Sequence, residues 1–325
     1  MKEKELINSY SSAESGFPVK IILNENVMSM IRSKRLLPVT VNLNPTNICN
    51  LNCSFCSCKK RDRSKSLSID RIIWFFEQFD SIQSCIITGG GEPLLYDKFS
   101  EVIDFLNNRN ISIGLVTNGI LFDSINTETI EKIKWSRVSL SNKSLETGIL
   151  DVIERTMERS KNIKWSFNFV CGETNEKNIE VFRSFYIKFS NKINHFMVVD
   201  DLYIMDERVN SLKIAVEQMN IDRSKIIYRT RQKHVPGNKK CYIAMLKPNI
   251  SAEGDIYPCC GVQYAMKDSF GNRNYDERLS MGKIEEAKHI WSNNFFDGSC
   301  DVCYYDKYNK LIDNIFSDVD DLEFI

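Results

Sequence analysis

The sequence predicts an α/β fold in which a parallel sheet curves into part of a barrel. Strand-like and helix-like segments alternate from Val39 to Val199. Six strands with a helix between each pair require a parallel sheet with right-handed crossovers. Two chemically distinctive motifs follow two of the strands at their carboxyl ends, where such barrels carry their chemistry. The chain has 325 residues, enough for this large domain and a smaller second one.

The six strands are predicted from runs rich in β-branched and aromatic residues, some with alternating apolar and polar positions. A helix with apolar residues at i, i+3, i+4 and i+7 is predicted after the first strand, with Ser68 placed to cap it. The predicted strands cover residues 39–44, 86–88, 113–117, 137–140, 164–170 and 195–199. The predicted helices cover residues 69–79, 99–106, 128–133, 145–159, 176–189 and 210–219.

Composition bounds the class of protein. The chain has 43 Lys and Arg residues against 43 Asp and Glu residues, which gives no reason to expect nucleic acid or an anionic membrane as a partner. It contains no apolar run of membrane-spanning length, and its start lacks the apolar core of a signal peptide. We therefore expect a cytoplasmic protein. In a reducing compartment, 11 cysteines indicate metal or redox chemistry rather than disulfides, and only 3 His disfavour His-rich metal sites.

Three cysteines stand on the loop that leaves the first predicted strand. Cys49, Cys53 and Cys56 have the spacing C-x₃-C-x₂-C. Closely spaced thiolates of this kind hold iron–sulfur clusters, and three of them would leave the fourth iron of a cubane without a protein ligand. A partial zinc site or reduced core thiols are the alternatives that the spacing alone leaves open.

A second motif follows the second predicted strand. Gly89, Gly90 and Gly91 precede Glu92 and Pro93. Glycines allow a ligand to approach the backbone, and the carbonyl groups and the Glu92 carboxylate would accept hydrogen bonds from an ammonium group. Taken alone, this run would indicate only a turn.

Together, the two motifs resemble the radical S-adenosylmethionine (SAM) superfamily, whose members carry an aromatic residue before the last cysteine of the triad, here Phe55. The resemblance implies a partial (β/α)₆ TIM barrel and a [4Fe-4S] cluster whose open iron binds SAM. It implies reductive cleavage of SAM to a 5′-deoxyadenosyl radical, with an electron donor such as flavodoxin or ferredoxin. It also places Ser139 near the SAM ribose. Arg155 is expected either at the SAM carboxylate or as an exposed helix charge.

The C-terminal part carries a second set of cysteines. The turn Pro236-Gly237 indicates a boundary, which divides the chain into an N-terminal extension (1–38), a barrel (39–235) and a small C-terminal domain (236–325). A β-hairpin is predicted over residues 250–258. From the residues alone, a zinc site and an iron–sulfur cluster are equally compatible with four thiolates. These four cysteines are Cys241, Cys259, Cys300 and Cys303.

This C-terminal part resembles the SPASM/twitch extension of radical SAM enzymes. The matching positions are Gly254 ahead of Cys259, the run Gly282-Lys283-Ile284, Trp291 and the final C-x₂-C pair. No cysteine follows Cys303, so the resemblance is to the shorter twitch form. It implies one auxiliary [4Fe-4S] cluster with the four cysteines as ligands.

The remaining cysteines have simpler interpretations. Cys85 and Cys171 border predicted strands and are expected in the core, and Cys58 is expected to be a spectator thiol beside the triad. Cys260 is expected to be a buried spacer or an alternative ligand. A similar Cys-Cys stretch in an epipeptide epimerase suggests a second possibility, that Cys260 donates a hydrogen atom. The basic run at residues 229–234 is interpreted as a solvated face.

The sequence thus predicts a radical SAM enzyme that abstracts hydrogen from a small-molecule or peptide substrate. The outcome could be oxidation, epimerisation or bond formation. The contrasting hypothesis is a non-enzymatic scaffold that binds zinc or a cluster through four cysteines.

Overall fold

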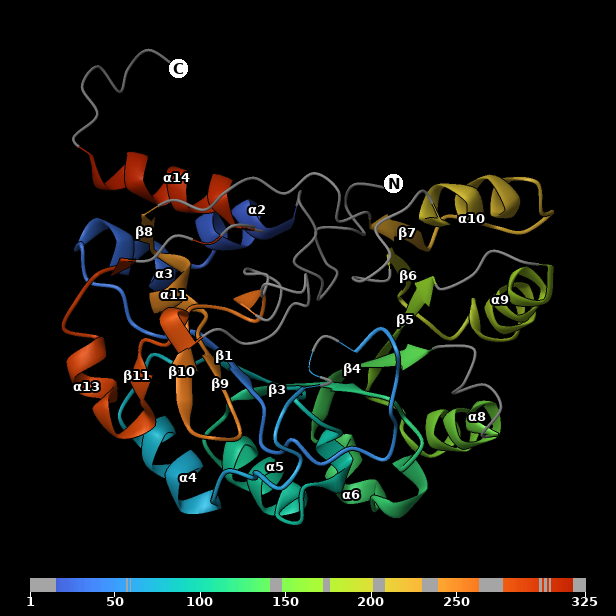
Figure 1. The fold of residues 1–325 in the computed structure, drawn as a ribbon, viewed down its shortest axis with the longest axis horizontal. Coiled ribbons are helices and arrows are strands. Elements are labelled where there is room, and N and C mark those ends of the chain that lie inside the picture. The colour runs from blue at the N-terminus through green and yellow to red at the C-terminus, as the bar shows by residue number, and fades with distance from the viewer. Residues whose placement is uncertain are drawn as a thin grey trace. The chain divides into compact units, whose positions relative to one another are not determined.

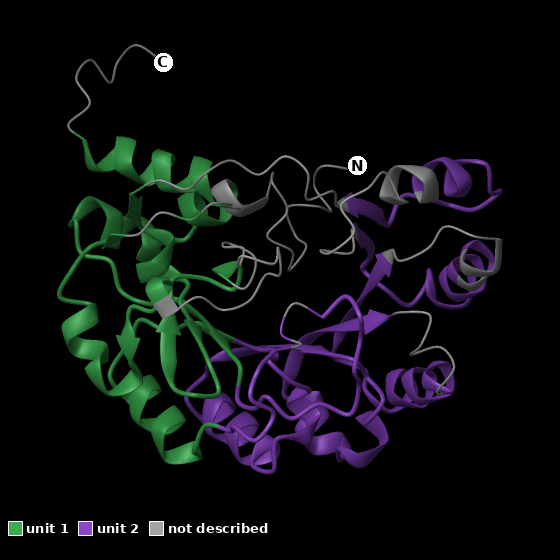
Figure 2. Ribbon diagram, viewed as in Figure 1, with its two compact units in different colours: residues 1–44, 67–85, 234–325 green, residues 45–66, 86–233 purple. Residues whose placement is uncertain are grey.

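The computed structural model describes residues 16–56, 58, 60–140, 148–171, 176–200, 208–229, 239–262, 277–297, 300, 303 and 305–317. Contacts divide the chain into two compact units, which Figure 2 shows in different colours. Unit 1 comprises Met1–Asn44, Leu67–Cys85 and His234–Ile325, and unit 2 comprises Pro45–Ser66 and Ile86–Lys233. Both units are therefore built from segments that are separate in the sequence.

Unit 2 contains a parallel sheet, which confirms the predicted α/β class. Its strands are hydrogen-bonded in the order β3-β4-β5-β6-β7, and each neighbouring pair is parallel. The last of them was not predicted, because its four residues adjoin the basic run and show too little periodicity. The strands are β3 (Ser112–Thr117), β4 (Ile133–Leu140), β5 (Lys164–Cys171), β6 (His195–Asp200) and β7 (Ile226–Arg229).

Helices connect these strands, as the alternation of segments predicted. Helix α10 lies against β5 and β6, and helix α9 packs on the same two strands (Figure 1). The contact between α9 and the sheet is aromatic: the Phe167 ring on β5 lies 4.8 Å from the Phe185 ring, and the Phe196 ring on β6 lies 5.0 Å from that of Phe182. The connections are η1 (Pro93–Leu95), α5 (Phe99–Asn108), η2 (Phe122–Ser124), α6 (Thr127–Glu131), α8 (Ile149–Arg159), α9 (Glu176–Phe189) and α10 (Arg208–Glu217).

The boundary between α6 and β4 differs from the prediction. The helix ends at Glu131 and the strand already begins at Ile133, within the range predicted as helical. Asn126 caps the helix by accepting a hydrogen bond from the Thr129 N–H at 2.8 Å. The chain then alternates buried Ile133, exposed Lys134 and buried Trp135, which is the pattern of a strand with one buried face.

Unit 1 gathers the start of the chain, the first helix of the barrel and the C-terminal part. The described residues at the start of the chain form two helices, whereas the sequence suggested one short helix over residues 27–36. Strand β2 (Ser84–Ile87) has its first two residues in unit 1 and its last two in unit 2. The other elements of unit 1 are α2 (Gly16–Leu23), α3 (Glu25–Arg32), β1 (Thr40–Leu43), α4 (Ile69–Glu77), β8 (Lys240–Cys241), α11 (Ile243–Leu246), β9 (Asn249–Ile250), β10 (Asp255–Tyr257), η3 (Glu277–Leu279), β11 (Gly282–Lys283), η4 (Ile284–Glu286), α13 (Ala287–Ile290), β12 (Phe296–Asp297) and α14 (Asp306–Phe316).

The predicted hairpin is confirmed. Strand β9 pairs with β10 in antiparallel fashion, β10 pairs with β11, and β9 also pairs in parallel with β1. Gly254 in the turn has φ +82°, and a Cβ atom there would lie 2.2 Å from Nη2 of Arg71. Both the left-handed backbone and the close side chain therefore favour glycine at this position.

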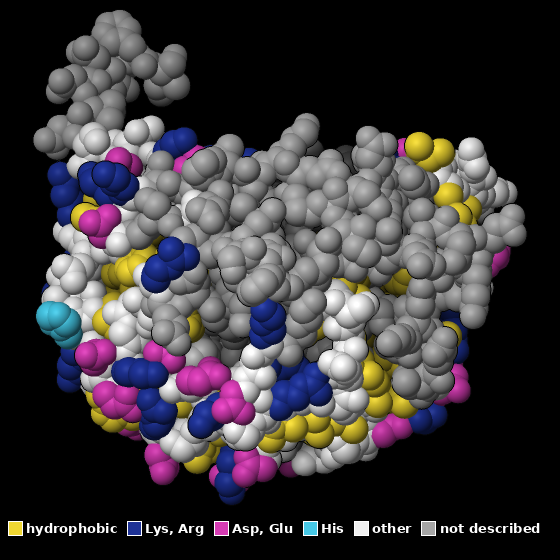
Figure 3. Space-filling model, viewed as in Figure 1, with side chains coloured by type: hydrophobic (Ala, Val, Ile, Leu, Met, Phe, Trp, Pro, Cys, Tyr) yellow, Lys and Arg dark blue, Asp and Glu magenta, His cyan; other side chains and the backbone are white. Residues whose placement is uncertain are grey.

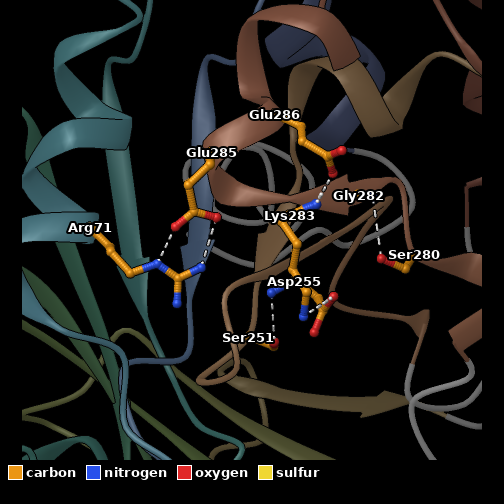
Figure 4. Close-up of polar contacts among 8 residues, drawn as sticks. All are labelled: Arg71, Ser251, Asp255, Ser280, Gly282, Lys283, Glu285 and Glu286. Carbon is orange, nitrogen blue, oxygen red and sulfur yellow. Dashed lines mark hydrogen bonds and ion pairs between the residues drawn. The ribbon is translucent and has the colours of Figure 1, made fainter.

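Polar contacts fix the hairpin and the turn that follows it, as Figure 4 shows. The Arg71 guanidinium makes two hydrogen bonds to Glu285, at 2.5 and 3.0 Å. Lys283 Nζ lies 2.8 Å from Asp255 Oδ1 on the paired strand, and the Lys283 N–H donates to Glu286 at 2.7 Å. The Arg71 contact lowers the pKa of Glu285. Since these groups are largely exposed, each pair is expected to contribute only about 0–1 kcal/mol.

On the face seen in Figure 3, basic and acidic side chains of the described residues are interspersed. None of the described helices is both long enough and apolar enough to cross a lipid bilayer. Ser68 holds the N-cap position of α4, although its side chain makes no capping hydrogen bond. The predicted boundary at Pro236-Gly237 lies outside the described residues, and the three-part division of the chain remains a prediction.

Candidate active site

The loop that carries the cysteine triad begins directly after β1 and is anchored by its own first residues. Thr46 Oγ1 accepts a hydrogen bond from the Ile48 N–H at 3.1 Å and lies 2.7 Å from Ser66 Oγ. The Asn47 N–H donates to the Lys65 carbonyl at 2.9 Å. These contacts join the beginning of the loop to its end. The three cysteines therefore lie on a loop whose two ends are hydrogen-bonded to each other.

The three triad thiols are partly exposed, and two of them accept hydrogen bonds. The Leu51 N–H donates to Cys49 Sγ at 3.5 Å, and Arg61 Nη1 donates to Cys56 Sγ at 3.4 Å. The Cys56 N–H donates to the Cys53 carbonyl at 3.2 Å, which closes a turn between these two cysteines. Burial raises the pKa of the Cys49 thiol, while the Leu51 N–H and the Arg61 charge act in the opposite direction.

Among the residues that the structure describes, no group of three or more cysteine, histidine or acidic side chains is arranged so that it could hold a metal ion. The donor chemistry of the triad loop nevertheless fits an iron–sulfur cluster. Three thiols follow one another on one short loop, and backbone and guanidinium N–H groups point at two of the sulfur atoms. Such N–H donors are a usual environment of cluster thiolates.

The glycine run packs directly against the triad loop. The Gly91 N–H donates to the Thr46 carbonyl at 2.9 Å, and the Glu92 N–H donates to the Ile48 carbonyl at 2.7 Å. A Cβ atom on Gly91 would lie 2.1 Å from the Ile48 carbonyl oxygen, and one on Gly90 would lie 2.1 Å from Asn47 Oδ1. The sequence suggested that these glycines allow a ligand to approach the backbone. In the structure, the absence of a side chain on Gly90 and Gly91 also allows the triad loop to pack closely against them.

Glu92 is 2% exposed, and its carboxylate accepts three hydrogen bonds. Oε1 accepts hydrogen bonds from Thr117 Oγ1 at 2.6 Å and from the Leu94 N–H at 3.1 Å. Oε2 accepts one from the Asn118 N–H at 2.8 Å. Burial raises the pKa of Glu92, and the three hydrogen bonds lower it in part. The carboxylate therefore connects the glycine run to the end of β3, while direct contact with a SAM ammonium group remains a prediction.

Asn118 extends this connection to the triad loop. Its Nδ2 donates to Asn50 Oδ1 at 2.7 Å, and Asn50 directly follows Cys49. Thr117, Asn118 and Asn50 were not identified as functional residues from the sequence. The available signal was the position of Thr117 and Asn118 at the carboxyl end of a parallel strand, where functional groups gather.

Ser139, Arg155 and Phe55 are the other residues predicted to contact SAM or to lie beside the cluster. Ser139 lies near the end of β4, in register with Asn168 on β5. Arg155 on α8 pairs with Asp123 Oδ2 at 2.5 Å, and the two side chains are 56% and 44% exposed. This contact raises the pKa of Arg155. The guanidinium thus takes part in a surface ion pair, as the alternative prediction of an exposed helix charge described. Phe55 lies on the triad loop and is half-buried.

The second cysteine set lies in unit 1. Cys241 is on β8 and is paired with Phe296 of β12, Cys259 follows β10, and Cys303 precedes α14. Their thiols accept hydrogen bonds from Asn309 Nδ2 at 3.7 Å, the Gly261 N–H at 3.3 Å and the Tyr305 N–H at 3.4 Å, respectively.

These thiols also interact electrostatically. Burial raises the pKa of Cys241 to about 12, and nearby Cys303 and Cys300 raise it further. Burial raises the pKa of Cys259 as well, with added contributions from Cys260, Cys241, Cys300 and Cys303. Each of these contributions means that the negative charge of one thiolate would disfavour ionisation of the other thiol.

Cys260 and Trp291, the other two predicted residues of the C-terminal part, have neighbours within unit 1. Cys260 is half-buried, and its Sγ lies 3.9 Å from the Tyr305 hydroxyl. Trp291 is buried, its Nε1–H donates to the Met245 carbonyl at 2.9 Å, and its ring packs 5.0 Å from that of Phe79. Cys85 is buried as expected, and Cys58 is buried as well. The side chain of Cys171 and most of the basic run lie outside the described residues.

Comparison with known families matches the triad loop and the glycine run to one superfamily. The family model described as the Radical SAM superfamily matches residues 43–169. These residues include the cysteine triad, Glu92, Ser139 and Arg155. The match shows that this part of the chain is similar to the radical SAM superfamily.

Two curated proteins are similar to parts of this chain. The chain is 26% identical over 285 residues to "Uncharacterized protein MJ0907" of Methanocaldococcus jannaschii, covering 78% of this chain and 94% of that protein. It is 33% identical over 111 residues to a "Probable GTP 3',8-cyclase" of Methanococcus maripaludis, covering 32% of this chain and 35% of that protein. The chain thus matches about a third of the cyclase.

A solved structure shows the same fold over most of the chain. Streptococcus suis SuiB bound to precursor peptide SuiA superposes with a TM-score of 0.55 at 18% identity, covering 84% of this chain and 72% of SuiB. SuiB bound to S-adenosylmethionine gives a TM-score of 0.54 at 17% identity, with 86% and 75% covered. At this level of identity the likeness concerns the fold alone.

Proposed function

We propose that this protein is a radical SAM enzyme whose SAM-binding [4Fe-4S] cluster is held by Cys49, Cys53 and Cys56. The observation that carries the proposal is the direct hydrogen bonding between the triad loop and the glycine run, through the Gly91 and Glu92 N–H groups. A cluster on one loop and a ligand for its open iron on the other would then be adjacent. When bound, the cluster supplies the electron that cleaves SAM to methionine and a 5′-deoxyadenosyl radical.

The chain's own residues have binding and positioning roles in this proposal. The Gly89–Gly91 carbonyl groups would accept hydrogen bonds from the SAM ammonium group. Glu92 holds the glycine run in place through its bonds to the end of β3, and its charge favours an ammonium nearby. Ser139 would contact the ribose, and Phe55 would cover one side of the cluster. An electron donor such as flavodoxin or ferredoxin would supply the reducing electron.

The test is anaerobic incubation of the iron-loaded protein with SAM and dithionite, followed by chromatography for 5′-deoxyadenosine and methionine. Both products are expected, in equal amounts. Colourless protein that contains zinc and cleaves no SAM would instead support the contrasting hypothesis of a non-enzymatic scaffold. Adding candidate small molecules or peptides and following their masses would then identify the substrate class.

We further propose that Cys241, Cys259, Cys300 and Cys303 hold an auxiliary [4Fe-4S] cluster of the twitch type. The N–H donors at three of the thiols and the mutual pKa effects support it. Four protein ligands leave no open iron, so the role would be electron transfer, substrate positioning or structure rather than direct ligation of substrate.

The double substitution Cys300→Ala/Cys303→Ala is expected to remove about four irons, since a cubane that loses two of its four thiolates is not retained. The measurement is iron and sulfide content per chain after anaerobic reconstitution. The substitution Cys85→Ala, at a buried thiol outside both sets, serves as the control and should change neither value. Loss of only about two irons or fewer from the double variant would contradict the auxiliary cluster.

One reaction outcome has a specific structural observation in its favour. Cys260 is half-buried rather than enclosed in the core, and the Tyr305 hydroxyl is its neighbour. A thiol S–H at such a position could return a hydrogen atom to a substrate radical, as an epimerase requires. Incorporation of solvent deuterium into a product, lost in Cys260→Ala while SAM cleavage continues, would support epimerisation over oxidation.

A further inference from the structure

Arg61 is held in one orientation beside the cysteine triad. Its Nε donates to the Asn47 carbonyl at 2.8 Å, and its Nη1 donates to the Cys58 carbonyl at 2.5 Å. The same Nη1 lies 3.4 Å from Cys56 Sγ, within hydrogen-bonding distance of sulfur. Two backbone carbonyls on either side of the guanidinium therefore direct one of its N–H groups at a triad sulfur.

The stem of this side chain lies next to the glycine run. A Cβ atom on Gly90 would be 3.8 Å from Arg61 Cδ and 2.1 Å from Asn47 Oδ1, the residue whose carbonyl Arg61 binds. Arg61 thus binds the triad loop and lies beside the glycine run. Because a guanidinium remains charged at all physiological pH values, it places a fixed positive charge at this point.

We infer that Arg61 is a positioning residue that raises the reduction potential of the cluster bound by Cys49, Cys53 and Cys56. This inference rests on the proposed function. Reduction adds one electron from a low-potential donor, with no atom transferred and no proton taken up by Arg61, so the ligated cluster becomes more negative by one charge. A hydrogen bond and a cation at a ligand sulfur stabilise that more negative state.

Arg63 provides a matched control, because it has the same side chain, lies in the same segment and also contacts the triad loop. Its Nη2 donates to Asn52 Oδ1 at 2.8 Å and to the Leu51 carbonyl at 3.4 Å. Both acceptors are oxygen atoms between the first two triad cysteines. Removing the Arg63 charge therefore tests the effect of net charge in the loop without removing a hydrogen bond to sulfur.

The experiment is an anaerobic redox titration of reconstituted holoenzyme, followed by electron paramagnetic resonance of the reduced clusters. The signal of the SAM-binding cluster is recognised by its change when SAM is added. Arg61→Gln is expected to shift the reduction equilibrium about tenfold toward the oxidised form, or about 59 mV for a one-electron couple. Arg61→Lys is expected to give a smaller shift, and Arg63→Gln none. Iron content should stay at the level of the unsubstituted protein in all three.

Full iron content with an unchanged potential in Arg61→Gln would overturn the inference. If Arg61→Gln fails to load iron, Arg61→Lys decides, because a lowered potential there supports the inference and an unchanged one overturns it. Loss of iron from both variants would show a purely structural role and would also overturn it. A protein without any SAM-sensitive signal before substitution would instead contradict the proposed function.

Discussion

Replacing Cys49, Cys53 and Cys56 together by alanine is expected to abolish formation of 5′-deoxyadenosine from SAM. Alanine offers no ligand to iron, so the SAM-binding cluster cannot assemble, and about four irons per chain should be lost. The proposed auxiliary cluster, whose cysteines would lie on other segments of the chain, should keep its own iron. Iron content and chromatographic detection of 5′-deoxyadenosine under dithionite are the two measurements.

Cys58→Ala is the control for this experiment. Cys58 lies two residues beyond the triad but is 2% exposed. It should leave iron content and SAM cleavage close to those of the unsubstituted protein. A triple variant that still produced 5′-deoxyadenosine would show that the triad does not hold the catalytic cluster. A control variant that lost the same amount of iron would assign Cys58 to the ligand set.

Glu92→Ala is expected to weaken SAM binding by about ten- to a hundredfold, which corresponds to a charge-assisted contact of about 1.5–3 kcal/mol. The same substitution leaves Thr117 Oγ1 and the Leu94 and Asn118 N–H groups without their acceptor in a buried place. It should therefore also lower the free energy of unfolding by about 1–3 kcal/mol. SAM affinity is measured by calorimetry and stability by denaturant titration.

Measuring both SAM affinity and stability separates the role of Glu92 in positioning the glycine run from a direct contact with SAM. Glu92→Gln keeps the size of the side chain and one acceptor oxygen, so it should retain more stability than Glu92→Ala. Glu131→Ala removes an exposed carboxylate that accepts a hydrogen bond from the Lys161 N–H, and it should leave SAM affinity unchanged. SAM affinity that was unchanged in Glu92→Ala would contradict any role of this carboxylate in the site.

The elements of the fold were predictable where one local pattern extended over many residues. Helix α9 begins and ends at the predicted residues, Glu176 and Phe189, because its buried rings recur with helical spacing. The four residues of β7 have no such repeat, and they become a strand by pairing with β6. The early start of β4 was missed for a related reason. Ile130 of α6 and Ile133 of β4 are three positions apart, which is helical spacing, so the predicted helix was extended into the strand.

The candidate cluster ligands could be predicted from the sequence, but the hydrogen bonds between the loops of the site could not. The spacing of Cys49, Cys53 and Cys56 is local, so the sequence displays it directly. The contacts of Glu92 with Thr117 and Asn118 join residues that lie 25 and 26 positions apart. No pattern of one segment encodes such a contact, because it depends on how neighbouring strand ends come together. Arg61 was missed because it stands in a second charged segment, residues 59–65, and charge runs are usually solvated.

The pairing of β1 with β9 suggests that β1 needs the C-terminal hairpin to cover one of its edges. The Asn42 N–H donates to the Pro248 carbonyl and the Asn44 N–H to the Ile250 carbonyl, each at 2.9 Å. A chain shortened before this hairpin would leave these N–H groups of β1 without their acceptors, and an uncovered strand edge can pair with other molecules. The hairpin is therefore expected to protect the strand that leads into the triad loop from self-association.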